Sequence, residues 1–303
     1  MEVQRVEAPQ LRPLGVGDIV DRVFALYRSR PLLYIAASAV PYLLFILVIA
    51  VATFALAGTF VGLAQLMSTL ATGDVPDPAQ FATAVVSFSG FVLFVVVAAV
   101  LILSTQTTAL VYSMSARYLG RPITLGEALR AGLRATPRVI GTGLLIFLTF
   151  VVMWGVLAVV MAVSQQVIVV LVAVIAGFVA SFYILASTLT APVVATLEGV
   201  GPITAIRRAW SLSAGNRWRI LGLQLLLVIL NGVISAIVSA IFVTTLIGDA
   251  TLRTVAQQLV NAATTILWAP VEWGTFAILY YDLRVRHEAF DLQLAAEALP
   301  RET

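Results

Sequence analysis

The stretch Phe91-Val-Leu-Phe-Val-Val-Val-Ala-Ala-Val-Leu-Ile-Leu103 decides the fold, because it is apolar without interruption. It lies inside a longer segment, about 88–114, that contains no charged residue. A helix of ~20 apolar residues is long enough to cross the ~30 Å hydrocarbon core of a bilayer. This segment is therefore predicted to be a transmembrane helix.

Five further segments have a similar length and character, and they lie at about 32–57, 139–163, 167–189, 220–247 and 255–281. Together they predict six transmembrane helices. Pro41 and Pro270 fall inside the first and the last of the six. Because proline removes a backbone hydrogen bond of the helix, we expect bends at both positions.

Composition supports the same class for the whole chain. Hydrophobic residues make up 61% of the 303 residues and charged residues 11%, whereas about a quarter of a soluble domain is charged. This excludes a soluble core, a disordered chain and a nucleic-acid-binding domain. Residues 1–303 are predicted to form a single all-α integral membrane domain that binds no nucleic acid.

The basic residues predict the orientation. All of them are Arg, and all but Arg253 of the 18 lie in the two terminal tails, between helices two and three, or between helices four and five. Basic residues accumulate on the cytoplasmic side of membrane proteins. Both termini are therefore expected in the cytoplasm. The outer loop at about 58–87 is expected to hold a short interfacial helix at 61–70 and a turn at 72–78.

Short sequence matches predict an internal repeat. Pro122-Ile-Thr124 recurs as Pro202-Ile-Thr204, and Ser104-Thr-Gln-Thr107 recurs in pattern as Ser187-Thr-Leu-Thr190. They favour three units, at 14–120, 121–200 and 201–290, each with an amphipathic helix, a basic turn and a membrane hairpin. Since every unit starts and ends on one side, the repeats would be parallel. Chance likeness between apolar segments is the alternative.

The three amphipathic helices are expected to lie in the cytoplasmic interface. Their apolar stripes are Val16, Ile19, Val20, Val23, Phe24 and Tyr27; then Leu125, Leu129 and Leu133; then Ile203, Ile206 and Trp210. Thr124 and Glu127 have the spacing of a capping box. The residues predicted to contact lipid headgroups are Arg28, Arg30, Arg134, Arg138, Arg217 and Arg219. The alternative is that these helices serve only as lipid anchors that fix the topology.

Glu272 is the one clear ionisable residue at membrane depth, and such residues are functional candidates. A polar layer is predicted around it, and its further members are Ser104, Gln106, Ser187, Thr190 and Asn231. Two interpretations stay open. The layer either supplies hydrogen bonds between helices, or binds a substrate or an ion in a cavity.

Several kinds of chemistry are not expected. The chain has no Cys and a single His, His287, which excludes disulfides, thiolate sites and sites that need two imidazoles. No nucleotide-binding, hydrolase or metal-binding motif occurs, so we expect no metal, no cofactor and no enzyme. Near the C-terminus we expect solvated acids, with Asp282 able to pair with Arg284 and Arg286. The acids are Asp282, Glu288, Asp291 and Glu297.

Two stretches resemble a known bacterial family of multi-pass proteins. They are Leu14-Gly-Val-Gly-Asp-Ile-Val-Asp-Arg-Val-Phe-Ala-Leu-Tyr-Arg28 and Leu279-Tyr-Tyr-Asp-Leu-Arg-Val-Arg-His-Glu-Ala-Phe-Asp-Leu292. The family is labelled "glycerophosphoryl diester phosphodiesterase membrane domain". In the proteins behind that label, the domain is fused to a soluble catalytic barrel that uses two His with acidic metal ligands. With His287 alone, this chain lacks that set. The resemblance implies only a membrane domain near lipid-headgroup metabolism.

Two functions are therefore considered. The first is a non-enzymatic protein of the bacterial cytoplasmic membrane that binds lipid, or supports a membrane partner or a homo-oligomer. The second is a transporter or channel with a polar site around Glu272. A cavity that reaches Glu272 favours transport, and a packed interior with lipid at the Arg residues favours the first.

Overall fold

The structure is a computed structural model of the chain, and it describes residues 13–164, 166–244 and 249–289. Within these ranges the chain is helical and has no strand, as the sequence predicts. The helices are α1 (Val16–Ser29), α2 (Pro31–Ala55), α3 (Ala57–Ala71), α4 (Pro78–Tyr118), α5 (Leu125–Ser164), α6 (Val167–Thr188), α7 (Ala191–Leu197), α8 (Pro202–Leu212), α9 (Arg217–Ser239), the π-helical turn η1 (Ala240–Thr244) and α10 (Ala250–Glu288).

Five of these helices are long and apolar enough to cross a membrane, and they are Pro31–Ala55, Pro78–Tyr118, Leu125–Ser164, Val167–Leu197 and Arg217–Phe242. The sixth predicted segment forms α10, which is long enough but is less apolar than these five. Its second half is buried in protein, from Trp268 to Val285. A helix surrounded by protein can carry the polar residues that a lipid-facing helix excludes.

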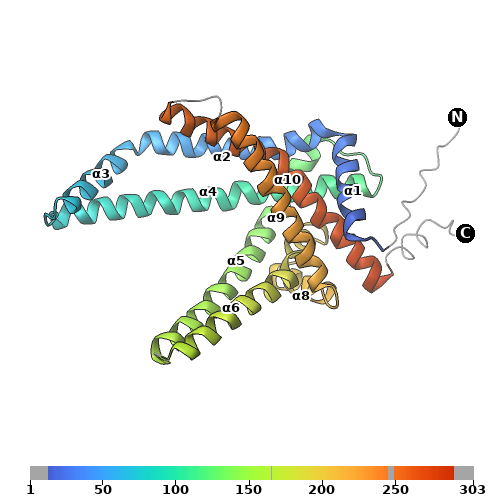
Figure 1. Cartoon of the computed structure of the whole chain (residues 1–303). Helices are drawn as coiled ribbons and strands as arrows, with labels where there is room; N and C mark the ends of the chain where they lie inside the picture. The colour runs from blue at the N-terminus through green and yellow to red at the C-terminus, as the bar shows by residue number, and fades with distance from the viewer. Residues whose placement is uncertain (1–12, 165, 245–248, 290–303) are drawn as a thin grey trace, which may run out of the picture.

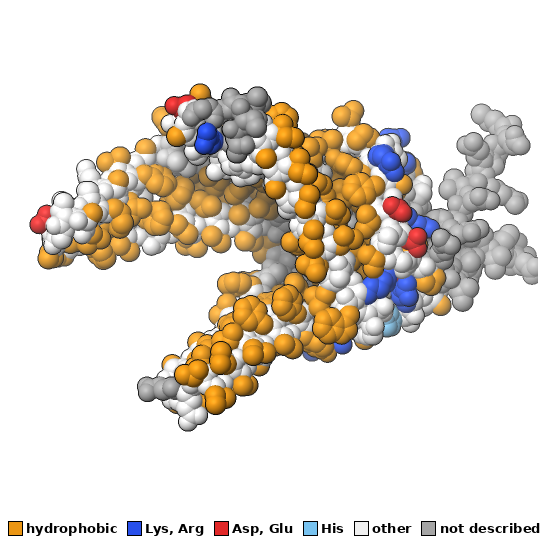
Figure 2. All heavy atoms as spheres, in the orientation of Figure 1, with side chains coloured by type: hydrophobic (Ala, Val, Ile, Leu, Met, Phe, Trp, Pro, Cys, Tyr) orange, Lys and Arg blue, Asp and Glu red, His pale blue; other side chains and the backbone are white. Residues whose placement is uncertain are grey.

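The helices form arms that diverge from one hub (Figure 1). One long arm holds α2, α3 and α4, and a second holds α5 and α6. A third hairpin pairs α9 and η1 with the first half of α10. The hub consists of α1, α7, α8, the second half of α10 and the adjoining ends of α4, α5, α6 and α9, and most of the buried apolar side chains belong to it. Figure 2 shows apolar side chains over the arms and basic ones gathered at the hub.

The outer loop predicted at 58–87 is largely helical, so the predicted boundaries there are wrong. The short helix expected at 61–70 is part of α3, and only residues 72–77 separate α3 from α4. The Asp77 carboxylate accepts a hydrogen bond of 3.2 Å from Ala79 N at the start of α4. With 41 residues, α4 is about 62 Å long at 1.5 Å per residue. This is about twice the ~30 Å hydrocarbon core.

The second amphipathic segment is not a separate helix, which corrects the predicted turn before residue 139. It is the start of α5, whose 40 residues include Pro137. In contrast, Pro31 opens α2, and Gly215 with φ +74° follows α8, so the other two segments end before their membrane helices. The predicted capping box is confirmed, because Thr124 N donates to the Glu127 carboxylate over 2.8 Å.

The contact between α4 and α5 depends on one glycine. A Cβ atom at Gly132 would lie 3.0 Å from Ala109 N and 3.1 Å from Thr108 Oγ1. The close approach lets Thr108 donate to Gly132 O over 3.0 Å, while the Thr105 and Thr136 hydroxyls lie 3.0 Å apart. Small residues and hydroxyl hydrogen bonds are the usual means by which membrane helices associate.

The substitution Gly132→Leu should therefore destabilise the protein by about 2 kcal/mol or more, since overpacking a tight contact costs roughly 1–3 kcal/mol. The matched control is Gly126→Leu in the same helix, where a Cβ atom meets nothing within 4 Å. Unfolding in detergent, followed by circular dichroism, measures both. Equal stability of the two variants would contradict a glycine-dependent contact.

Candidate functional site

The hub is organised by Asp282, whose side chain is fully buried. Its carboxylate accepts hydrogen bonds from Leu14 N at 2.6 Å, from Arg219 Nη1 at 2.6 Å and from Arg286 Nε at 3.0 Å. The same two Arg residues donate to the Leu14 carbonyl, over 2.5 and 2.8 Å. We call this set the Asp282 clasp. It joins the segment before α1 to the start of α9 and the end of α10.

A second polar ring lies beside the clasp and contains Glu198, Arg208, Tyr280, Arg284 and Glu288. Arg208 Nε donates to Glu198 over 3.1 Å, and its Nη1 pairs with Glu288. Arg284 Nε donates to Glu288 over 2.9 Å, and the Tyr280 hydroxyl donates to Glu198 over 2.8 Å. A 3.5 Å contact from Arg284 Nη1 to the Tyr280 hydroxyl closes the ring. The ring ties α8 and the end of α7 to α10.

Both networks correct the prediction for the C-terminal acids. Asp282 is 2% exposed and not solvated, because the end of α10 is enclosed by the segment before α1 and by α9. Its predicted pairing with Arg286 is confirmed, whereas Arg284 pairs with Glu288. Asp291 and Glu297 lie outside the described residues.

The predicted polar layer is divided between separate helix contacts. Gln106 Nε2 of α4 donates to the Ser38 hydroxyl of α2 over 2.7 Å. Ser187 accepts from Arg217 Nε over 2.8 Å, so it joins α6 to α9. Thr190 is buried and its hydroxyl has no partner among the described residues. Ser104 is half-buried, and its carbonyl accepts from Thr108 within α4.

Glu272 and Asn231 do not take part in these helix contacts among the described residues. Glu272 is half-buried, and its carboxylate has no hydrogen bond or ion pair within the described ranges. Among the described residues, Asn231 Oδ1 accepts only a 3.5 Å hydrogen bond from Ser235, on its own helix. Hydrogen bonds therefore do not join either residue to the Ser and Thr groups of the predicted layer.

Arg217 has an unusual setting among the predicted headgroup residues. Its guanidinium carbon lies 4.5 Å from the centre of the Tyr183 ring and 5.4 Å from that of Trp210. Nε is held by Ser187, but neither terminal nitrogen has an acceptor among the described residues. The next residue, Trp218, is 86% exposed. The aromatic rings and Ser187 fix the guanidinium, and no described residue occupies its two outer nitrogens, which can donate to a ligand.

An apolar groove of about 520 Å³ lies on α6, and this guanidinium stacks on one of its lining residues. Its lining runs from Val172 to Ile184 and includes Tyr183, the ring on which Arg217 stacks. The groove is thus bordered at Tyr183 by a cation whose two outer nitrogens have no acceptor among the described residues. The sequence does not predict this pairing of groove and guanidinium, because it does not show that the start of α9 packs beside the end of α6.

The other predicted headgroup residues have different settings. Arg28, Arg30, Arg134 and Arg138 are exposed at the hub, whereas Arg219 belongs to the Asp282 clasp. The amphipathic helices also differ. Ile19 and Val23 of α1 are fully buried in the hub core, so this stripe faces protein and not lipid. In α8, the small residues Ala205 and Ala209 are buried, while Ile203 of the predicted stripe is 59% exposed.

Replacing Asp282 by Asn should cost about 3–5 kcal/mol of stability, the usual loss when one partner of a buried ion pair is removed. The control Asp21→Asn changes an exposed carboxylate of α1 and should stay within about 0.5 kcal/mol of the wild type. Chemical unfolding in detergent measures both. A loss below 1 kcal/mol for Asp282→Asn would show that the clasp is dispensable.

The polar ring should lose stability in acid. Burial would raise the pKa of Glu288, but hydrogen bonds from Arg208 and Arg284 hold it below its ordinary value. A lowered folded-state pKa contributes stability above the unfolded value of about 4.3, and the contribution is lost as pH falls through the lowered pKa. The Tm difference between wild type and Glu288→Gln should therefore shrink from pH 6 to pH 3. A constant difference would contradict the ring's ionic character.

Comparison with known protein families identifies the family to which this chain belongs. Residues 128–283, more than half of the chain, match a family described as "Domain of unknown function (DUF7847)". No curated protein and no solved structure matches the chain. The matched region runs from the first turn of α5 through Asp282 and includes α7, α8 and Arg217. The chain belongs to this DUF7847 family.

Proposed function

We propose that this protein is a non-enzymatic, multi-pass protein of the bacterial cytoplasmic membrane that binds phospholipid at its hub. In this proposal α10 supplies a sixth span, and the three hairpins are parallel repeats with the hub and both termini in the cytoplasm. The distribution of charge supports the orientation, because basic side chains gather at the hub and apolar side chains cover the arms (Figure 2).

The arms are suited to contact with lipid. In the most apolar window of α5 no residue is buried in protein, and in that of α4 only 6% are. Exposed surface of this kind is stable only in an apolar solvent. Because the arms diverge, lipid chains can reach the sides of the hairpins as well as the outside of the molecule (Figure 1).

The observation that carries the proposal is the contact of Arg217 with Tyr183, which lines the α6 groove near one of its ends. An acyl chain fits along the apolar lining between Val172 and Ile184. The phosphate would then accept hydrogen bonds from the two free nitrogens of Arg217, a geometry that suits phosphate oxygens. Trp210, Tyr183 and Trp218 would lie at headgroup depth, where aromatic residues are common.

The sequence resemblance agrees with this proposal. The two stretches that resemble the glycerophosphoryl diester phosphodiesterase membrane domain meet in the Asp282 clasp through Leu14 and Asp282. In this proposal the resemblance reflects a shared hub next to lipid headgroups. Such a hub could also hold a membrane partner or a second copy of the chain.

A second candidate is a transporter or channel that uses Glu272. The half-buried carboxylate without a bonded partner is the observation that favours it. Transport through this site would require its charge, so Glu272→Gln should abolish proton or cation flux into proteoliposomes. Unchanged flux in that variant, or none in the wild type, would remove this candidate.

Substituting Arg217 by Gln should reduce co-purifying phosphatidylglycerol, measured by native mass spectrometry, by about tenfold. This corresponds to losing about 1.4 kcal/mol from a charge-assisted contact. Arg207→Gln is the matched control, because Arg207 is an exposed residue of α8 at the same hub. Equal retention in the two variants, or no phospholipid on the wild type, would overturn the proposal.

A further inference from the structure

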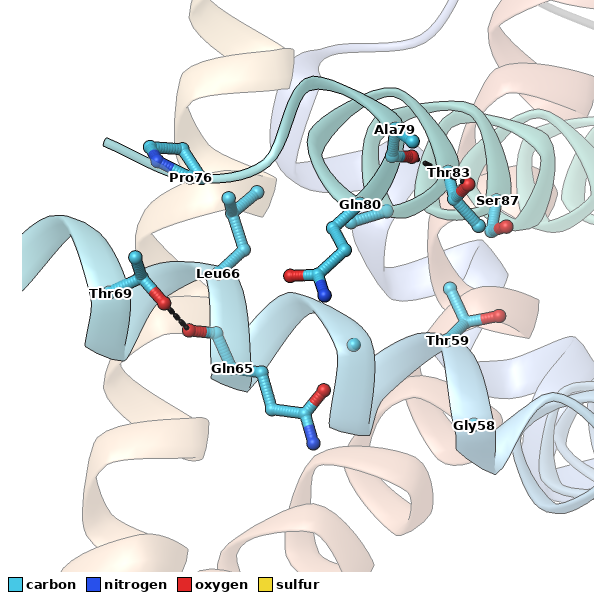
Figure 3. A pocket seen from close by; sticks show the side chains of 12 residues that line it. Gly58, Thr59, Gln65, Leu66, Thr69, Pro76, Ala79, Gln80, Thr83 and Ser87 are labelled. Atoms are coloured by element: carbon cyan, nitrogen blue, oxygen red, sulfur yellow. Dashed lines mark hydrogen bonds between the residues drawn. The ribbon is translucent and has the colours of Figure 1, made fainter. Parts of the chain in front are cut away.

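A second groove lies at the far ends of α3 and α4, away from the hub (Figure 3). Its volume is about 480 Å³, within the roughly 300–1,000 Å³ range of small-molecule sites. Six hydrogen-bonding side chains line it: Thr59, Gln65 and Thr69 from α3, and Gln80, Thr83 and Ser87 from α4. None of its lining residues is charged.

Four of these side chains are free to bind a ligand. The amides of Gln65 and Gln80 and the hydroxyls of Thr59 and Ser87 have no hydrogen-bond partner among the described residues. Figure 3 shows Gln80 extending from α4 toward α3. Thr69 and Thr83 each donate to a carbonyl four residues earlier, and their oxygens can still accept. The groove therefore offers both donors and acceptors from two facing helices.

The length of α4 sets the depth of this groove. Ser87 and Ala79 precede Arg117, at the hub end, by 30 and 38 residues, or about 45 and 57 Å of helix. The hydrocarbon core is only ~30 Å thick. In the proposed orientation, the groove thus lies at or beyond the outer headgroup layer, where hydroxyl-rich groups occur.

The surrounding charge selects against anions. Asp74 and Asp77 lie in the turn that joins the two helices, and Pro76 between them lines the groove. The nearby carboxylates repel a phosphate or sulfate, and no basic residue belongs to the lining. This setting is opposite to that of Arg217 at the hub.

We infer that the α3–α4 groove binds a neutral, hydroxyl-rich group of the saccharide type, either as a free sugar or as the headgroup of a glycolipid. Amide side chains bind vicinal hydroxyls by donating to one and accepting from the other. The inference depends on the proposed function only for the side of the membrane, since the groove and its lining belong to the fold itself.

Glycines in α3 and α4 provide a matched pair of variants. A Cβ atom at Gly62, which lines the groove, or at Gly90, which does not, meets nothing within 4 Å. Gly62→Leu should fill the groove, and Gly90→Leu should leave it open. Both variants should fold, which thermal unfolding checks.

The experiment is native mass spectrometry of the full chain, purified in a detergent without a sugar headgroup. The probes are maltose and monoglucosyl diacylglycerol. We expect at least one probe to bind wild type and Gly90→Leu equally and Gly62→Leu about tenfold more weakly, a loss of about 1.4 kcal/mol. Binding of maltose identifies a free sugar as the ligand class, and binding of the glycolipid alone identifies a headgroup.

Three outcomes would overturn the inference. One is that neither probe binds the wild type. Another is that Gly62→Leu binds as well as Gly90→Leu. The third is that the wild type is a dimer and Gly62→Leu a monomer, which would assign the groove to a second copy. Phosphatidylglycerol retention should be unchanged in Gly62→Leu and sugar binding unchanged in Arg217→Gln, so the failure of either proposal is recognised separately.

Discussion

The arrangement of the hairpins depends on the burial of one carboxylate, Asp282. A buried ion is stable only when several donors replace the water it loses. Here the donors come from three places in the chain, namely Leu14, Arg219 and Arg286. The same Arg residues satisfy the Leu14 carbonyl, so each polar group of the clasp supports another. Because Arg219 and Leu14 are 63 and 268 residues away from Asp282, the clasp forms only when the segment before α1 and the third hairpin are in place.

Interactions at the hub, the clasp among them, explain how the arms can diverge while the helices stay associated. In a bilayer, apolar helices gain little by contacting each other instead of lipid chains, so packing and hydrogen bonds must hold them together. Within the described residues these interactions concentrate near the hub, as in the pair of Gln106 with Ser38 and the close contact at Gly132. Away from it, the α4 and α5 faces are largely unburied. The hub therefore fixes the directions of the hairpins, and lipid can occupy the space between them.

The sequence predicted what depends on local pattern and missed what depends on contacts between distant segments. Hydropathy identifies the apolar helices because their solvent is lipid, and the capping box of Thr124 and Glu127 is visible as a spacing. Hydropathy shows that α10 is less apolar, but it does not show that protein surrounds the second half of this helix. Nor does it show that α5 continues through Pro137, or that Asp282 is buried, since each outcome is decided by elements far away in the chain. The pairing of Asp282 with Arg286 is the part of the clasp that the sequence predicted, because the two residues are four apart on one helix.

The two ends of the molecule differ in the chemistry they offer, and this follows from how its few charges are used. At the hub, Glu198, Asp282 and Glu288 pair with Arg, as in the ring that links Glu198 and Glu288 through Arg208. Arg217 is held instead by Ser187 and aromatic rings, so its charge is available to an anion. At the α3–α4 groove, amides and hydroxyls line the surface and the nearest charges are negative. If both proposals hold, an anionic headgroup is favoured at the hub and disfavoured at the opposite end, so the two proposed sites differ in the ligands they prefer.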